Sequence, residues 1–246
     1  MKRYQEQATV RSYDTDHAGR LKPSALFNYF QEAAWRHAEM LGFGYTALLE
    51  HNLFWVISRV QLEWTEELRW GDEIIVETWP KGVTKLFALR DFIVRRADGG
   101  EAIRATSAWL TLDLESKRPR RPETIMDDTA MLENDHAIEQ VPGKIAMPTD
   151  LYHTANRIAR YSDLDVNRHV NNARYVDWLF DALPPRTDMA MPFSRLNVQF
   201  TGEARWNDEL DVLTEVHDSI GTAYASIVNR TDDRHVCDAV LAFPRA

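Results

Sequence analysis

The sequence predicts an α+β protein built from two copies of one folding unit, each an antiparallel sheet wrapped around a long central helix. Two observations lead to this prediction. The chain aligns with itself twice without a gap, and each copy has the same order of elements: a strand, a long apolar helix and several strands. A helix followed by an antiparallel meander favours a layered unit with the helix on the concave face of the sheet. Two such units would most simply pair by pseudo-two-fold symmetry, like a homodimer fused into one chain.

The internal alignments cover the helices and the first strands after them. Residues 14–33 match residues 163–182 at an offset of 149. Residues 58–78 match residues 194–214 at an offset of 136, and ten of these 21 positions are identical. A repeat this long is too large for a solenoid, so each copy is expected to be a domain-sized unit.

The first copy begins with a loosely alternating segment, 5–13, that predicts a strand. A long helix follows, opened by Pro23 and ended by Gly42. Four more strands are then expected near residues 55–66, 72–80, 84–96 and 101–114.

The second copy repeats this order. Its helix is apolar nearly all round, starts near Asn172 and is stopped by Pro184 and Pro185. Strands are expected near residues 193–202, 208–217, 221–231 and 234–243. The resulting boundaries are an N-terminal domain at 1–114, a Pro-rich and charged linker at 115–149, and a C-terminal domain at 150–246.

Composition narrows the possible functions. The net charge is −9, which argues against nucleic acid as a partner. The single cysteine, Cys237, excludes an internal disulfide and favours a reducing, cytoplasmic location. In the last predicted strand, this cysteine is interpreted as a core residue rather than a nucleophile. No apolar stretch predicts a signal peptide or a membrane span, and no motif predicts a metal or cofactor.

The two copies differ where chemistry would need them to differ. Asn167 and His169 of the second copy are replaced by Ala18 and Arg20 in the first. An amide and an imidazole ahead of a buried helix can act on a carbonyl group, because the free N–H groups at a helix start favour a developing negative charge. We therefore predict one active site, in the C-terminal unit.

Two carboxylates complete the candidate set, although both are kept in the first copy. In an extended segment, Asp165, Asn167 and His169 would address one cavity, because residues two apart share a face. Asn172 would cap the helix that follows. Glu203, in the strand of the second alignment, is either a fourth site residue or a solvated strand carboxylate.

The string DLDVNRHVNNARYVDW, followed about thirty residues on by FTGEARWND, resembles the active-site signature of acyl-[acyl-carrier-protein] thioesterases. The resemblance covers nearly the whole chain and implies a tandem hotdog fold. It implies hydrolysis of a fatty acyl thioester on the 4′-phosphopantetheine arm of acyl carrier protein, releasing free fatty acid and ending chain elongation. It also implies Asp165, Asn167, His169 and Glu203 as the catalytic set. Ala204 stands where plant members usually have cysteine, which favours attack by water.

The resemblance also suggests substrate-binding and docking residues. An acyl channel bounded by the N-terminal unit would involve Leu26, Phe27, Phe30 and Trp55, with Asn172 near the thioester. Acidic acyl carrier protein would dock on the basic run Lys117, Arg118, Arg120 and Arg121, and it would also explain why Lys81, Lys85 and Arg90 are basic. Read without the resemblance, that run is either a solvated linker or a docking patch.

Two alternatives stay open at this stage. The chain could be an acyl-coenzyme A thioesterase of the same superfamily, or a non-catalytic acyl-binding or regulatory protein. The oligomeric state is likewise open, between a monomeric pseudo-dimer and a homodimer. No motif in the sequence predicts the length or the saturation of the acyl chain.

Overall fold

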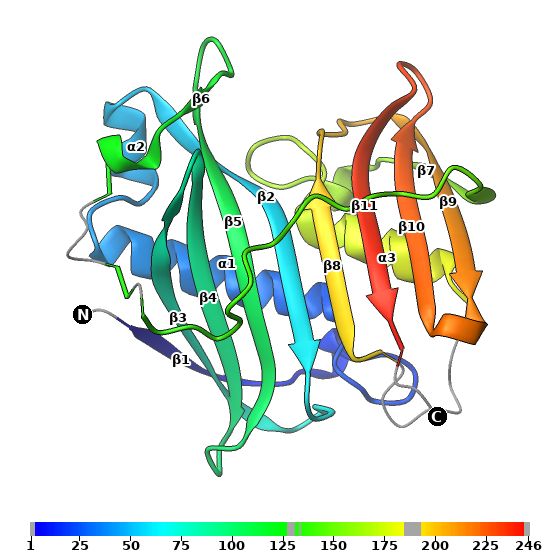
Figure 1. Ribbon diagram of the computed structural model, residues 1–246, viewed down its shortest axis with the longest axis horizontal. Coiled ribbons are helices and arrows are strands. Elements are labelled where there is room, and N and C mark those ends of the chain that lie inside the picture. Colours follow the sequence, from blue (N-terminus) through cyan, green and yellow to red (C-terminus); the bar gives the residue numbers. More distant parts are fainter. Residues whose placement is uncertain (1–2, 127–130, 133, 185–192, 244–246) are drawn as a thin grey trace. The chain divides into compact units, whose positions relative to one another are not determined.

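The chain folds as two compact units. The computed structural model describes residues 3–126, 131–132, 134–184 and 193–243. One unit comprises Met1–Leu21 and Asn28–Gly143, and the other comprises Lys22–Phe27 and Lys144–Ala246. Each unit contains an antiparallel sheet and few helices (Figure 1), which confirms the predicted α+β class.

The first unit has a five-stranded sheet in the order β1-β3-β4-β5-β2, with every neighbouring pair antiparallel. The strands are β1 (Tyr4–Thr9), β2 (Leu53–Trp64), β3 (Glu73–Thr84), β4 (Phe87–Arg96) and β5 (Glu101–Asp113). A two-residue strand, β6 (Pro119–Arg120), pairs with β5. The helices are α1 (Pro23–Met40), whose first turn clusters with the other unit, and the short α2 (Tyr45–Glu50).

The second unit repeats the arrangement in the order β8-β11-β10-β9-β7, again with antiparallel pairs. Its strands are β7 (Tyr152–Ile158), β8 (Arg195–Phe200), β9 (Glu209–His217), β10 (Thr222–Asn229) and β11 (Arg234–Ala242). Its helix is α3 (Asn172–Ala182), which ends before Pro184. The second proline of the predicted stop, Pro185, lies outside the described residues.

The two units share backbone pairings at the offsets read from the sequence. Thr15 bridges to Leu21 in the first unit, and Leu164 bridges to Val170 in the second. Each residue of the second bridge lies 149 positions after its counterpart in the first. The other shared bridges are Arg20 to Arg69 and His169 to Arg205, at offsets of 149 and 136. The sequence repeat is therefore a structural repeat.

Strand β4 shows how the sheet of the first unit uses both faces. Phe92 stacks on Phe30 of α1 at 4.3 Å between ring centroids, and the Arg90 guanidinium lies 3.1 Å from Nδ1 of His37 on the same helix. Asp91 points to the opposite face because side chains alternate along a strand. Burial lowers the pKa of Arg90 to about 9.

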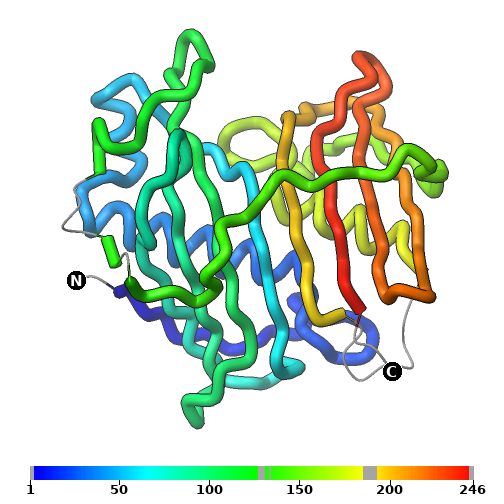
Figure 2. Tube along the Cα trace, in the orientation of Figure 1, coloured from blue at the N-terminus to red at the C-terminus, as the bar shows by residue number. Residues whose placement is uncertain are grey.

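The opposite face binds part of the predicted linker. Asp91, fully buried, accepts hydrogen bonds from the Thr106 hydroxyl at 2.6 Å and the Ala137 amide at 2.7 Å. Lys81 Nζ lies 3.7 Å from Asp91 Oδ1 and donates to the Ile138 carbonyl. Residues 135–139 thus pack on this face of the sheet and form part of the first unit. Figure 2 shows the trace of the chain.

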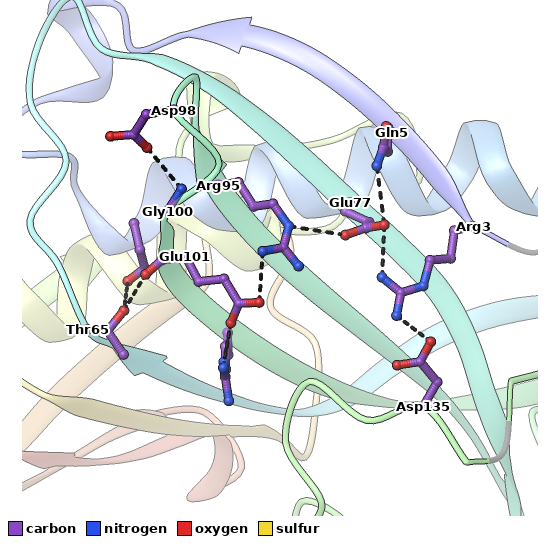
Figure 3. Close-up of polar contacts among 11 residues, drawn as sticks. Arg3, Gln5, Thr65, Glu77, Arg95, Asp98, Gly100, Glu101 and Asp135 are labelled. Atoms are coloured by element: carbon purple, nitrogen blue, oxygen red, sulfur yellow. Dashed lines mark hydrogen bonds and ion pairs between the residues drawn. The ribbon is translucent and has the colours of Figure 1, made fainter.

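Surface ion pairs extend this attachment. Arg3 pairs with Glu77 at 2.9 Å and also with Asp135 (Figure 3). The Asp135 carbonyl accepts the Trp79 indole N–H at 2.8 Å. Arg95 continues the network from Glu77. Residues 135–138 are therefore held against the sheet by hydrogen bonds and an ion pair.

A matching buried carboxylate lies in the second unit. Asp238 of β11 accepts a hydrogen bond from Ser226 of β10 at 2.6 Å and another from Gln199 of β8 at 2.9 Å. Gln199 in turn accepts the Ile145 amide at 3.0 Å. His235 Nδ1 lies 3.0 Å from Oδ1 of Asp238, the oxygen that accepts the Ser226 hydroxyl. In both units a buried carboxylate with a cross-strand hydroxyl thus organises the sheet face away from the helix.

Within the described ranges, no helix combines the length and apolarity needed to cross a bilayer.

Replacing Asp91 with alanine should lower the free energy of unfolding by about 3–5 kcal/mol, because buried Lys81 would lose its carboxylate partner. Urea unfolding followed by circular dichroism measures the change. The exposed Glu50→Ala serves as control and should change stability by less than about 0.5 kcal/mol. Equal stability of the two variants would show that the Asp91 cluster does not stabilise the fold.

Candidate active site

The segment before α3 is a closed turn rather than an extended strand. The Asp165 amide donates to the His169 carbonyl at 2.9 Å, and the Arg168 amide donates to the Asp165 carbonyl at 3.0 Å. Asp165 Oδ1 accepts the Asn167 amide at 2.8 Å, and Arg168 has a left-handed φ of 64°. The expectation that Asp165, Asn167 and His169 share a face through strand alternation is therefore wrong. The carboxylate competes for nearby backbone amides and folds the turn instead.

Glu203 lies in the connection between β8 and β9, beside this turn. The Val170 amide donates to the Ala204 carbonyl at 2.9 Å, and His169 forms a backbone bridge with Arg205. At the start of the connection, the Thr201 and Gly202 amides both donate to the Val236 carbonyl. These bonds hold the connection next to the residues that precede α3.

The two segments bring the side chains of His169 and Glu203 together. Nε2 of His169 lies 3.3 Å from Oε1 of Glu203, which also pairs with the Arg205 guanidinium at 2.9 Å. The side chains of His169 and Glu203 are 29% and 49% exposed, so both water and a substrate can reach them. An imidazole beside a carboxylate is an arrangement suited to proton transfer.

The other two predicted catalytic residues, Asp165 and Asn167, are close in sequence, but within the described part of the chain their side chains form no hydrogen bond or ion pair with this pair. Asp165 uses its carboxylate to fold the turn. Asn167 is exposed, and its side chain forms no hydrogen bond with the described residues. Among those residues, no three His, Cys, Asp or Glu side chains gather as a metal site would require.

The cap of α3 is Asn171, not Asn172. Asn171 has an extended backbone, and its side-chain oxygen accepts the Ala173 amide at 2.8 Å. Asn172 is the first helical residue and is half-buried. With two adjacent asparagines, the sequence did not determine which one occupies the non-helical position that capping requires.

The four residues predicted for an acyl channel are buried or partly buried, but they divide between the units. Leu26 and Phe27 cluster with the second unit, where the Phe27 ring lies 6.2 Å from that of Phe200. Phe30 and Trp55 belong to the first unit. Trp55 packs against an apolar cluster that includes Phe43, Leu48, Leu53, Met126 and Met131.

The predicted basic run lies on the exposed hairpin of β5 and β6. All four of its cations are exposed: Lys117, Arg118, Arg120 and Arg121. Asp113 folds the hairpin by accepting the Ser116 amide and hydroxyl at 2.8 and 2.9 Å and by pairing with Arg120 at 3.2 Å. These contacts lower the pKa of Asp113 to about 2, and the hydrogen bond from the Ser116 amide contributes most.

Two of the additional basic residues cannot bind a partner. Lys81 and Arg90 are only 4% and 6% exposed, so their assignment to docking is wrong. Both charges point into the fold and are engaged by the Asp91 cluster and by α1. Lys85 is exposed, as a docking residue would need to be.

The sequence reasoning missed two residues that contact the site. Arg205 pairs with Glu203, and Tyr175 accepts a hydrogen bond from the Ala204 amide at 2.8 Å. The alignment of the two copies pairs Tyr175 with Leu26, and this difference is the sequence signal that distinguishes Tyr175. Cys237 is fully buried, and burial raises the pKa of its thiol, which agrees with an inert core residue.

Comparison with known proteins places the chain in a family. The family model for the acyl-ACP thioesterase N-terminal domain matches residues 1–131, and that for the C-terminal domain matches residues 148–243. The chain belongs to the acyl-ACP thioesterase family. The segment with His169 and Glu203 falls within the second match.

Several members of the acyl-ACP thioesterase family are similar over most of this chain. Dodecanoyl-[acyl-carrier-protein] hydrolase of Cinnamomum camphora is 30% identical over 89% of the chain and 60% of its own length. Oleoyl-acyl carrier protein thioesterase 1 of Arabidopsis thaliana is 26% identical over 93% of the chain and 68% of its own length. The first five curated relatives are matched over 55–68% of their length.

Solved structures of the family cover the whole fold. An acyl-ACP thioesterase from Bacteroides thetaiotaomicron superposes with a TM-score of 0.90 at 26% identity, over 99% of this chain and 98% of that one. The 12:0-ACP thioesterase of Umbellularia californica gives a TM-score of 0.86 at 24% identity, over 99% and 98%. The antiparallel sheets and few helices therefore form a hotdog-like α+β fold.

Replacing Asn171 with alanine should destabilise the protein by about 1 kcal/mol, because the Ala173 amide would lose its capping oxygen. Asn172→Ala should leave the free energy of unfolding nearly unchanged. Thermal unfolding of the two variants measures the difference. The reverse order of stabilities would mean that Asn172 is the cap after all.

Proposed function

We propose that this protein hydrolyses the thioester between a fatty acyl chain and acyl carrier protein, releasing free fatty acid. The observation that carries the proposal is the contact of His169 Nε2 with Glu203 Oε1 at 3.3 Å, in the segment that matches the family's C-terminal domain. An exposed imidazole–carboxylate pair can activate water. A thioester has a good leaving group, so water attack needs no covalent intermediate.

In the proposed mechanism, Glu203 takes a proton from the attacking water. Its Oε1 is occupied by His169 and Arg205, which leaves Oε2 for the water. His169 keeps the carboxylate oriented and can pass the proton to the departing thiolate. General-base catalysis of this kind contributes about 10²–10⁴-fold to the rate.

The oxyanion would be stabilised by hydrogen-bond donors outside the His169–Glu203 pair. Asn167 is exposed and its amide group is available to donate. The Ala173 amide is already used by Asn171, so the donor at the helix start would be the Asn172 amide. Asp165 contributes by folding the turn that carries Asn167 and His169. One donor of this kind is worth about 10²–10³-fold.

The proposed architecture is a tandem double hotdog, with domains at 1–114 and 150–246 joined by 115–149 and paired by pseudo-two-fold symmetry. Support comes from the backbone bridges that recur at offsets of 149 and 136. The acyl chain would be bound by Leu26, Phe27, Phe30 and Trp55. The methionines that pack near Trp55 suit an apolar ligand, because their flexible side chains adapt to its shape.

Acyl carrier protein is the proposed partner, docking on the hairpin of residues 113–121. Its basic run is exposed, and the contacts of Asp113 give it a defined shape. Cations on a protein of net charge −9 would steer an acidic partner to this one region.

Replacing Glu203 with glutamine should lower kcat for an acyl-ACP substrate by about 10²–10⁴-fold, because the amide cannot accept the proton. Glu67→Gln is the matched control from the other copy and should keep kcat. Free fatty acid release is quantified by mass spectrometry. A wild-type protein without hydrolysis would support a non-catalytic acyl-binding role, and faster hydrolysis of the same acyl group on coenzyme A would support an acyl-CoA thioesterase.

The double charge reversal Arg118→Glu with Arg121→Glu should lower kcat/KM for acyl-ACP by about tenfold at low salt, because electrostatic steering is lost. Hydrolysis of the same acyl group on N-acetylcysteamine should not change. Arg234→Glu, an exposed reversal in the second unit, is the control. An unchanged, salt-insensitive kcat/KM in the double variant would exclude the hairpin as the docking site.

A further inference from the structure

Tyr175 is the residue that connects α3 to the connection carrying Glu203. It is 2% exposed, and its ring packs edge-on against Trp178, at 5.7 Å between centroids, and at a tilt against Phe200, at 6.1 Å. Its hydroxyl accepts the Ala204 amide at 2.8 Å. The aromatic packing leaves the ring little freedom, so the hydroxyl is a fixed acceptor.

The Ala204 peptide is bound on both of its polar groups by the segment that follows His169. Its carbonyl accepts the Val170 amide at 2.9 Å, and its amide donates to Tyr175. Val170 directly follows His169, and Ala204 directly follows Glu203. The two hydrogen bonds therefore set the register between the imidazole and the carboxylate.

The first unit provides an internal comparison. There the Leu21 amide donates to the Leu68 carbonyl at 2.8 Å, which reproduces the bond from Val170 to Ala204. The counterpart of Tyr175 is Leu26, which has no hydroxyl. The carbonyl bond is thus common to both units, whereas the hydroxyl bond accompanies the unit that has both Asn167 and His169.

We propose that Tyr175 is a positioning residue, whose hydroxyl holds the Ala204 peptide so that Glu203 stays against His169. This inference rests on the proposed function, because it explains how the hydrolytic pair is kept in register. Burial raises the pKa of the Tyr175 hydroxyl, so the group stays neutral. It acts through the backbone and does not touch the substrate.

Tyr175→Phe removes the hydroxyl and keeps the ring. We expect kcat for acyl-ACP to fall by about tenfold or more with KM within about twofold, because orientation of the reacting groups is lost while substrate contacts remain. In a Glu203→Gln background the same change should cost no further activity, because the hydroxyl acts only through the carboxylate. An independent, multiplied loss would overturn the proposal.

The matched control is Tyr29→Phe. Tyr29 is a partly buried tyrosine of α1 whose hydroxyl bonds Asp14 at 2.6 Å in the first unit. This variant should keep kcat while removing a comparable hydrogen bond. If Tyr175→Phe folds poorly, Tyr175→Leu introduces the residue of the other copy at this position. Both are assayed well below their melting temperatures.

A readout that does not depend on hydrolysis separates this inference from the proposed function. In Tyr175→Phe, hydrogen exchange of the Ala204 amide should accelerate by at least about tenfold, and the NMR signals of the His169 ring should shift. Unchanged exchange at Ala204 would overturn the positioning role even in an active enzyme. Absence of hydrolysis in the wild type would instead count against the proposed function.

Discussion

The structure of the candidate site depends on one backbone hydrogen bond, from the Val170 amide to the Ala204 carbonyl at 2.9 Å. It joins the turn before α3 to the connection before β9, two segments more than thirty residues apart in the chain. Because Val170 follows His169 and Ala204 follows Glu203, this bond also brings the backbone positions of the two residues close together. The equivalent bond from Leu21 to Leu68 occurs in the first unit at 2.8 Å. This hydrogen bond is therefore a feature of the fold that both units share, including the unit without Asn167 and His169.

A second constraint acts on the opposite faces of the sheets. Asp91 and Asp238 are almost fully buried, and each accepts a hydroxyl from the neighbouring strand at 2.6 Å. A buried carboxylate is costly unless it is well hydrogen-bonded, and each of the two receives part of its bonding, directly or indirectly, from the segment predicted as the linker. The Ala137 amide binds Asp91, and the Ile145 amide binds the glutamine that binds Asp238. Each unit thus uses a backbone amide from this segment in its own polar interior.

Sequence reasoning recovered the features that repeat and missed those that depend on single contacts. The two offsets predicted the strands after each helix and the helix starting near Asn172, because apolar periodicity and duplication are read from many residues together. The turn at residues 165–168 was missed because Asp165 bonds its own backbone, which a pattern of alternating positions does not reveal. Burial of Lys81 was missed because its partner, Asp91, lies ten residues away across a hairpin. A charged residue is predicted to be exposed unless the sequence also reveals its buried partner.

The divergence of the two copies has a simple electrostatic basis. In the first unit each of the two carboxylates faces an arginine: Asp16 pairs with Arg20 at 2.9 Å, and Glu67 pairs with Arg69. In the second unit Glu203 keeps its arginine, but the position of Arg20 is taken by His169. An arginine stays protonated at any physiological pH, so the first unit has a permanent ion pair there, whereas an imidazole can gain and lose a proton. The shared position therefore carries a permanent cation in the first unit and a side chain that can exchange a proton in the second.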